Sequence, residues 1–160
     1  MLSELDALAT EVLDAARSHR ETIATAESLT GGLIAATLTR IPGASDVFVG
    51  ATVAYTLAAK ARLLDLSEAD VESHGVYSEW TATQMAQSVQ RRLGTSIGVA
   101  CSGVAGPGSA GDTPAGEVHI AVARHGVVAY ACCHFSGSRH EVRQATVREA
   151  LAMLLTLLRS

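Results

Sequence analysis

The sequence is poor in several features, and each shortage excludes a class of protein. It has only three cysteines in 160 residues, and two of them, Cys132 and Cys133, are adjacent. That count disfavours a disulfide framework and fits a reducing cytoplasm. No run of about 18 apolar residues occurs, so we expect no membrane span. Basic residues are fewer than acidic ones, 12 against 16, and a net charge of −4 offers no general attraction to nucleic acid or an anionic membrane.

Aromatic residues are also scarce, at 4%, whereas 48% of the residues are hydrophobic. The core is therefore expected to consist mainly of Ala, Val, Leu and Ile. A length of 160 residues favours one domain, 1–160, which can bury about two thirds of its unfolded surface. The first residues are acidic and amphipathic, with no basic region before an apolar stretch, so we expect no signal peptide.

Apolar residues follow helical spacing in some segments and strand-like runs in others, which predicts an α/β fold. We expect a single-domain α/β sandwich with a central mixed sheet flanked by helices. The first helix should bury Leu2, Leu5, Leu8, Val12, Leu13 and Ala16. The last two strands should form a hairpin that turns at His125-Gly126. The expected helices span 3–20, 33–40, 56–64, 78–93 and 138–158, and residues 67–70 open another short helix. The expected strands span 22–26, 47–55, 96–101, 117–124 and 127–135.

The segment 26–32, Ala-Glu-Ser-Leu-Thr-Gly-Gly, joins the first expected strand to the following helix. It places the Ser28 hydroxyl on a tight strand-to-helix turn. Two glycines at the expected helix start would leave backbone N–H groups open to an anion. This arrangement suits a serine nucleophile beside an oxyanion hole. A capped helix is the alternative, because Ser and Thr are preferred N-cap residues.

Lys60 is the only lysine in the chain, against eleven arginines. Lysine, unlike arginine, can lose its proton inside a protein and act as a base. Alanines on both sides give Lys60 an apolar setting, and desolvation would lower its pKa. The alternative is a surface lysine whose aliphatic part alone is covered.

Tyr55 stands five residues before Lys60 and could orient or relay a proton, or it could be an ordinary core tyrosine. The pair resembles the Tyr-x-x-x-Lys of short-chain dehydrogenases, but its spacing is one residue longer. No dinucleotide-binding fingerprint follows the first strand.

Two further patterns point to an anion. The run Gly103-x-x-Gly106-Pro107-Gly108 directly follows a strand, as phosphate-binding loops do, and Ser102 adds a hydroxyl at its start. Arg139 and Arg143 lie four residues apart in the first turns of the last helix. Cations there oppose the helix dipole, so we expect a nearby anion, either a protein carboxylate or a substrate phosphate.

The run Cys132-Cys133-His134 and the other histidines show no metal-ligand spacing. Alternation along a strand sends Cys132 and His134 to one face and Cys133 to the other. We therefore expect core cysteines and an edge histidine, and no metal site.

Together, these motifs resemble those of the CinA C-terminal domain family, whose characterised members are nicotinamide-nucleotide amidases. The resemblance extends from about residue 5 to residue 158. It rests on Ala26-Glu27-Ser28-x-Thr30-Gly31-Gly32, on Val53-Ala54-Tyr55 with Lys60, on Gly103-x-Ala105-Gly106-Pro107-Gly108, and on Phe135-x-Gly137-x-Arg139-x-x-Val142-Arg143.

The resemblance implies hydrolysis of the carboxamide of nicotinamide mononucleotide to nicotinic acid mononucleotide and ammonia. Ser28 would be the nucleophile, Lys60 its base and Tyr55 an assisting hydroxyl, without a cofactor or metal. Homo-oligomers are common in the family and are expected here. Residues of the same motifs would bind the substrate: Glu27, Thr30, Gly31, Gly32, Ser102, Gly103, Ala105, Gly106, Gly108, Arg139 and Arg143.

The sequence departs from the family pattern at two positions. Leu29 replaces the cysteine that is common after the serine, which would reshape the nicotinamide pocket, and Ser102 stands where threonine is usual. Two other functions stay open at this stage. One is a catalytically silent nucleotide-binding module, and the other is a reductase that uses Tyr55 and Lys60.

Overall fold

A five-stranded mixed sheet forms the centre of the protein, whose computed structural model describes residues 2–160. The strand order is β2-β1-β3-β4-β5. β1 pairs in parallel with both β2 and β3, while β4 and β5 add to β3 as an antiparallel hairpin. The strands are β1 (Ile23–Glu27), β2 (Phe48–Val53), β3 (Ile97–Gly103), β4 (Glu117–Arg124) and β5 (Val127–His134).

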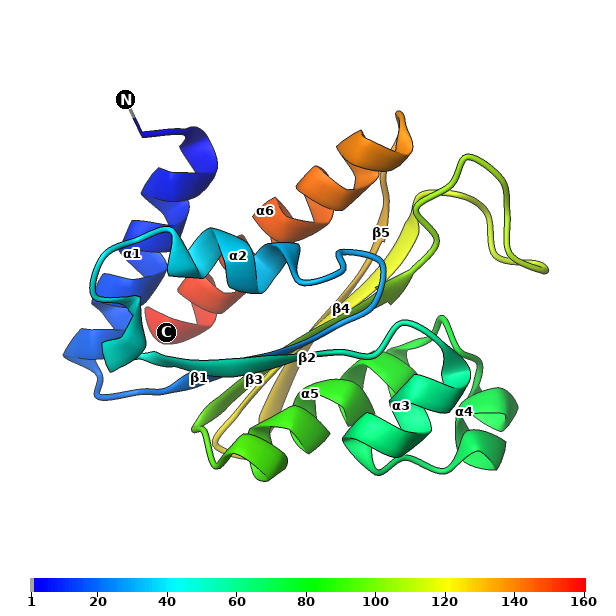
Figure 1. Cartoon of the computed structure of the whole chain (residues 1–160), viewed down its shortest axis with the longest axis horizontal. Helices are drawn as coiled ribbons and strands as arrows, with labels where there is room; N and C mark the ends of the chain where they lie inside the picture. Colours follow the sequence, from blue (N-terminus) through cyan, green and yellow to red (C-terminus); the bar gives the residue numbers. More distant parts are fainter. Residues whose placement is uncertain (1) are drawn as a thin grey trace.

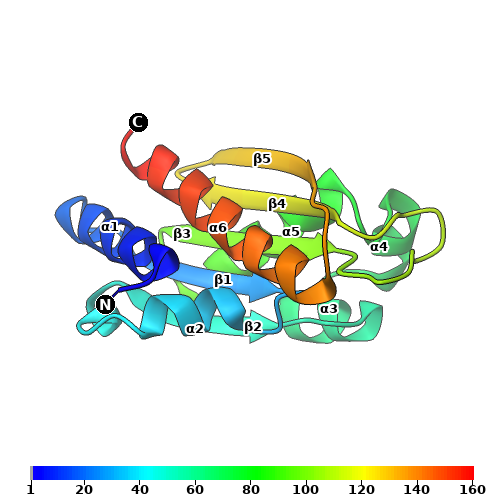
Figure 2. The same cartoon turned by 90° about the horizontal axis from the view of Figure 1, so that it is seen from above.

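Helices cover both faces of this sheet, which confirms the expected α/β class (Figure 1). On one face lie α1, α2 and α6, and on the other lie α3, α4 and α5 (Figures 1 and 2). The central strands β1 and β3 are buried along their whole length, as strands covered on both faces must be. The helices are α1 (Glu4–Ser18), α2 (Leu33–Thr39), α3 (Leu57–Leu64), α4 (Glu68–His74), α5 (Glu79–Leu93) and α6 (Arg139–Leu158), with a short 3₁₀ turn at Ala44–Asp46.

The helix boundaries follow from local sequence. Ser3 and Ser138 each form a capping box at the start of α1 and α6, and Gly94 adopts a left-handed conformation at the end of α5. The apolar face of α1 packs on the core except for Leu2, which precedes the helix and is exposed. The inclusion of Leu2 in the buried stripe is therefore wrong.

β3 is longer than the sequence suggests. Ser102 and Gly103, expected in the glycine-rich loop, pair with His119 and Val118 of β4 and so belong to the strand. The neighbouring antiparallel strand extends β3 in this way, and a local apolar run does not reveal it.

Within residues 2–160, no helix is both long and apolar enough to cross a membrane.

Candidate active site

The carboxyl ends of the three parallel strands meet at one edge of the sheet, where ligand sites of open α/β sheets form. Ser28 follows β1, Tyr55 follows β2, and the glycine-rich loop follows β3. α6 begins at the same edge with Arg139. These segments enclose an open pocket of about 310 Å³, a size typical of small-molecule sites. Its lining comprises Ser28, Leu29, Tyr55, Tyr77, Gly103, Val104, Ala105, Gly106, Pro107, Gly108, Ser109, Ala110 and Arg139.

The turn that carries Ser28 is built around the carboxylate of Glu27. This side chain is fully buried and accepts hydrogen bonds from the backbone N–H groups of Ile34 and Ala35, both at 2.9 Å. The hydroxyls of Thr30 and Thr25 donate to it at 2.6 and 3.1 Å. The protein's own carboxylate thus occupies the start of α2, where the helix dipole stabilises negative charge.

Part of the expectation that N–H groups near Thr30 to Gly32 are open to an oxyanion is corrected, because the Gly31 N–H already has a partner within the turn. The N–H of Gly31 donates to the carbonyl of Ser28, and that of Leu33 donates to the carbonyl of Thr30, both at 3.0 Å. Gly32, at a φ of +99°, is the N-cap residue of α2. Ser28 therefore does not cap the helix, and its hydroxyl is available to the pocket.

Lys60 lies directly behind Ser28. Its side chain is 0% exposed, so the alternative of a partly covered surface lysine is wrong. Its Nζ contacts the Ser28 Oγ at 3.2 Å and donates to the carbonyls of Ala54 and Tyr55 at 2.9 and 3.4 Å. A neutral amine in this position has two N–H groups for the two carbonyls and a lone pair that faces the serine hydroxyl.

Burial lowers the pKa of Lys60 from 10.5 to about 8, although the Cys101 sulfur nearby acts in the opposite direction. Among the described residues, no carboxylate forms an ion pair with Lys60. A lysine with this pKa is neutral for about a tenth of the time at pH 7 and half of the time at pH 8. The site therefore holds a lysine that can accept a proton from Ser28.

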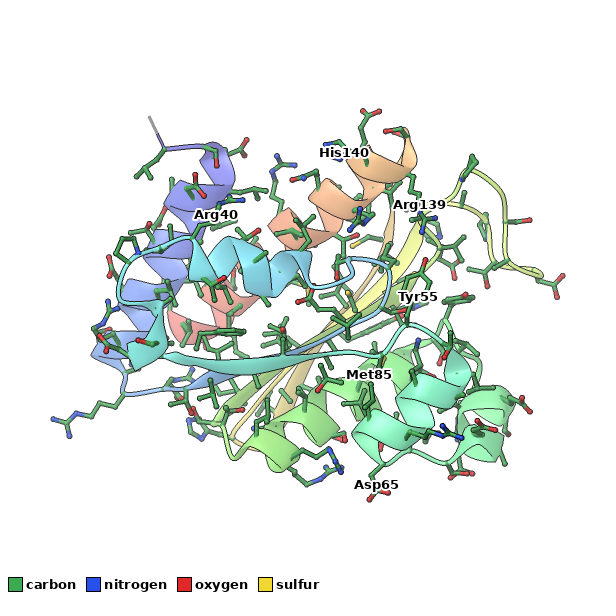
Figure 3. All side chains as sticks on the ribbon, viewed as in Figure 1. Arg40, Tyr55, Asp65, Met85, Arg139 and His140 are labelled. Carbon is green, nitrogen blue, oxygen red and sulfur yellow. The ribbon has the colours of Figure 1, made fainter. Side chains whose placement is uncertain are left out.

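Tyr55 does not place its hydroxyl beside Lys60. Its side chain is 54% exposed, so it is not a core tyrosine either, and its Oη accepts a hydrogen bond from Arg139 at 2.7 Å. Figure 3 shows the two side chains close to each other, Arg139 coming from the start of α6 and Tyr55 from the segment after β2. Only the backbone carbonyl of Tyr55 meets Lys60. This separation removes the hydroxyl-to-ammonium contact on which the reductase alternative depends.

Arg139 and Arg143 have different partners, and neither forms an ion pair within the described chain. Arg139 lines the pocket and also donates to the carbonyl of Gly106 at 2.8 Å. Arg143 donates to the carbonyls of Leu29 and Thr30, both at 3.0 Å. It therefore clamps the Ser28 turn and does not line the pocket.

Several residues expected to contact substrate instead have internal partners. Ser102 is buried and donates to the carbonyl of Val76 at 2.8 Å. Glu27 and Thr30 are buried in the turn, and Gly31 and Gly32 lie outside the pocket lining. The pocket lining does not include Glu27, Thr30, Gly31, Gly32, Ser102 or Arg143, so their direct contact with a substrate stays a prediction.

Tyr77 is a pocket residue that the sequence did not reveal. It precedes α5, and the Ser102 hydrogen bond to Val76 holds its segment against β3. The chain has few aromatic residues, and a tyrosine just before a helix could therefore have been recognised as a candidate pocket residue. Leu29, the departure from the family pattern, does line the pocket, as its expected influence on pocket shape requires.

Cys101 lies beneath this turn. Burial and the charge of Glu27 raise the pKa of its thiol to about 11, so the thiol is protonated at neutral pH. The Oγ1 of Thr30 lies 3.2 Å from its sulfur. Cys101 is therefore a packing residue and not a competing nucleophile.

A second polar cluster lies on the hairpin. Potential ligand atoms of Glu117, His119 and Cys132 all lie within 4.8 Å of one another, although spacing along the sequence suggested no metal site. The reason is pairing across strands, since His119 stands opposite Cys132. A two-residue turn at His125-Gly126 implies this pairing, so the sequence did contain the signal.

The fold and the pocket define an α/β protein with a serine hydroxyl and a buried lysine at the base of a small-molecule-sized site. The family model of the CinA C-terminal domain matches residues 5–158. The chain therefore belongs to the CinA C-terminal domain family.

Solved structures of the same superfamily share the whole fold. A competence-damaged (CinA) superfamily protein from Klebsiella pneumoniae superimposes with a TM-score of 0.94 at 30% identity, over 98% of this chain and 99% of that one. The competence/damage inducible protein CihA from Agrobacterium tumefaciens gives a TM-score of 0.93 at 37% identity, over 100% and 98%. A CinA-like protein of Salinibacter ruber is 47% identical over 69% of this chain and 27% of its own length. The chain spans about a third of the length of the curated relatives it matches.

Proposed function

We propose that this protein is a serine amidohydrolase that converts nicotinamide mononucleotide and water to nicotinic acid mononucleotide and ammonia. The observation that carries the proposal is the contact between the buried Lys60 amine and the Ser28 hydroxyl at the base of the pocket. A serine becomes a nucleophile when an adjacent base removes its proton. The pKa of Lys60 is lowered to about 8, where its amine can act as that base.

In the first half-reaction, neutral Lys60 accepts the Ser28 proton while the Oγ attacks the amide carbon. The tetrahedral intermediate then collapses, the C–N bond breaks, and Lys60 returns the proton to the departing ammonia. The result is a nicotinoyl ester on Ser28. Because the start of α2 is occupied by Glu27, the candidates for holding the oxyanion are N–H groups on the wall formed by residues 103–108, except that of Val104, which donates to the carbonyl of Glu117.

In the second half-reaction, water attacks the ester carbonyl and gives its proton to Lys60. Collapse releases the carboxylic acid and returns the proton to Ser28. The scheme requires no metal and no cofactor. Tyr55 assists by holding Arg139 at the pocket edge, a role that differs from the proton relay expected at first.

The pocket wall suits a pyridine nucleotide. Two of the three tyrosines in the chain, Tyr55 and Tyr77, line it, and aromatic faces attract a cationic ring such as the pyridinium of the substrate. Arg139 and the glycine-rich loop supply a cation and backbone groups for a phosphate. Both features favour a charged nucleotide over a simple aliphatic amide.

Ammonia release from nicotinamide mononucleotide by wild type, Ser28→Ala and Ser109→Ala tests this function. We expect turnover by the wild type, loss of at least about a thousandfold in Ser28→Ala, and little change in Ser109→Ala, which removes an exposed pocket hydroxyl that takes no part in the scheme. Circular dichroism of each sample shows that the fold is retained. A folded Ser28→Ala variant with near-wild-type turnover contradicts the nucleophile. If the wild type binds the nucleotide but releases no ammonia, the protein is a catalytically silent nucleotide-binding module.

A further inference from the structure

We propose that Glu117, His119 and Cys132 form a binding site for a transition-metal cation of the Zn²⁺ or Co²⁺ class, separate from the Ser28–Lys60 site. The three residues come from two adjacent strands and share one face of the hairpin. Val118, Ile120 and Val122 of β4 pack into the core under α6, so Glu117 and His119 point to the opposite face. Cys132 lies opposite His119 on β5 and is exposed.

Two of the three ligand atoms already lie close to the separation that they would have in a coordination sphere. The Nε2 of His119 lies 2.9 Å from the Oε2 of Glu117, where the two share a proton. In a tetrahedral zinc site, coordinating nitrogen and oxygen atoms lie about 3.3 Å apart, given bond lengths of about 2.0 Å. A cation can therefore replace that proton if these two atoms move apart by a few tenths of an ångström, and the Cys132 sulfur, within 4.8 Å of them, would coordinate at a separation of about 3.5 Å. Coordination also displaces the thiol proton of Cys132, and both protons leave to solvent.

The remaining contacts of the cluster resemble the outer shell of a metal site. The Nδ1 of His119 lies 2.7 Å from the hydroxyl of Tyr130, a contact that fixes the ring and leaves Nε2 as the ligand atom. The Nε2 of His134 lies 3.4 Å from the other Glu117 oxygen and helps to hold that carboxylate in place. The combination of thiolate, imidazole and carboxylate selects a zinc-like cation over magnesium or calcium, which prefer oxygen alone.

The cluster also lies close to the glycine-rich loop that follows β3. The carbonyl of Glu117 accepts a hydrogen bond from Val104, and Gly116 donates to the carbonyl of Val104. A cation held by Glu117 and Cys132 would therefore join β4 and β5 at the open end of the hairpin, where the glycine-rich loop leads into β4 (Figure 2). The expected consequence is a more stable protein when the cation is bound.

Titration of the chelator-treated protein with Co²⁺ tests the site, because a cobalt–thiolate bond gives a charge-transfer band in the near ultraviolet. We expect one equivalent of Co²⁺ per chain, displacement by Zn²⁺, and a rise in melting temperature with Zn²⁺. Cys132→Ser should abolish the band and weaken binding at least about tenfold, without loss of fold, since Cys132 is exposed. Cys133→Ser is the matched control, because Cys133 packs on the opposite face and should leave binding unchanged.

Two results overturn the proposal. One is the absence of saturable binding or of the band in the wild type. The other is a Cys132→Ser variant that binds as the wild type does. Both are independent of amidase activity, so they leave the Ser28–Lys60 proposal untouched.

Discussion

Arg139 and Arg143 illustrate how the surroundings of a residue decide its role. Both extend from the first turns of α6, and both were expected to share an anion. The backbone carbonyls of Leu29 and Thr30 hold Arg143, whereas the exposed guanidinium of Arg139 borders the pocket. We therefore assign the proposed phosphate contact to Arg139, while Arg143 holds the turn that carries Ser28.

Substrate phosphate recognition should depend on Arg139. We predict that nicotinamide riboside, which lacks the phosphate, is a poor substrate for the wild type. Arg139→Ala should lower kcat/KM for the mononucleotide by about 10- to 100-fold, the range of a charge-assisted hydrogen bond, and should change the riboside value little. Steady-state kinetics on both substrates measure these values.

Arg148→Ala serves as the control, because Arg148 is exposed on the same helix and pairs with Glu4. Equal kcat/KM values for riboside and mononucleotide in the wild type remove phosphate recognition from the account.

At the scale of elements, the strand-to-helix turn between β1 and α2 depends on one buried carboxylate. Glu27 accepts four hydrogen bonds and brings together the end of the strand, the turn and the start of the helix. A buried charge is stable only when it is fully bonded in this way. Within the proposed site, these bonds hold the turn that carries Ser28.

Replacing Glu27 should cost stability. We predict that Glu27→Gln lowers the free energy of unfolding by about 2–4 kcal/mol, because the amide group cannot accept all four bonds and loses the attraction to the helix start. Chemical denaturation of wild type and variant measures the difference. Glu68→Gln, at the exposed start of α4, should cost less than about 1 kcal/mol. Similar losses in the two variants would show that the buried hydrogen bonds are not what stabilises the turn.

At the scale of the whole molecule, the sequence predicted the helices and strands better than it predicted the hydrogen-bond partners of the polar side chains. Helices and strands were recognisable because apolar periodicity and capping residues are local signals. Because β1, β2 and β3 are parallel, Ser28, Tyr55 and the glycine-rich loop, each of which follows one of these strands, lie at the same edge of the sheet. The partners of Glu27 and Arg143 were not recognisable, because carboxylates and guanidinium groups bond to backbone groups that any residue can supply. The lysine was singled out by its rarity, and only the fold reveals that it is buried behind Ser28.

The packing of α5 on the sheet gives a test at this scale. A Cβ at Gly98 of β3 would collide with the carbonyl oxygen of Ala86 in α5, so the helix can approach the strand only over a glycine. We predict that Gly98→Ala lowers the free energy of unfolding by at least about 2 kcal/mol and the melting temperature by about 4–8 °C. Thermal denaturation measures both values.

Gly108→Ala is the matched control, because a Cβ at Gly108 meets open space. Its melting temperature should stay within about 2 °C of the wild type. A Gly98→Ala variant as stable as the wild type would contradict the close packing of α5.

The pH dependence of kcat for nicotinamide mononucleotide hydrolysis, compared between wild type and Lys60→Arg, shows whether Lys60 is the base that activates Ser28. Lys60 must be neutral to accept the Ser28 proton, and its pKa of about 8 means that raising the pH increases the active fraction. We expect wild-type kcat to rise about tenfold from pH 6 to pH 7 and to level off above pH 8. Arginine keeps the charge but cannot act as a base, so kcat of the variant should be at least about a hundredfold lower than that of the wild type. The increase of kcat between pH 6 and pH 8 should also disappear. A folded Lys60→Arg variant that keeps most of the activity, or a wild-type profile that is flat between pH 6 and pH 8, would contradict this role of Lys60.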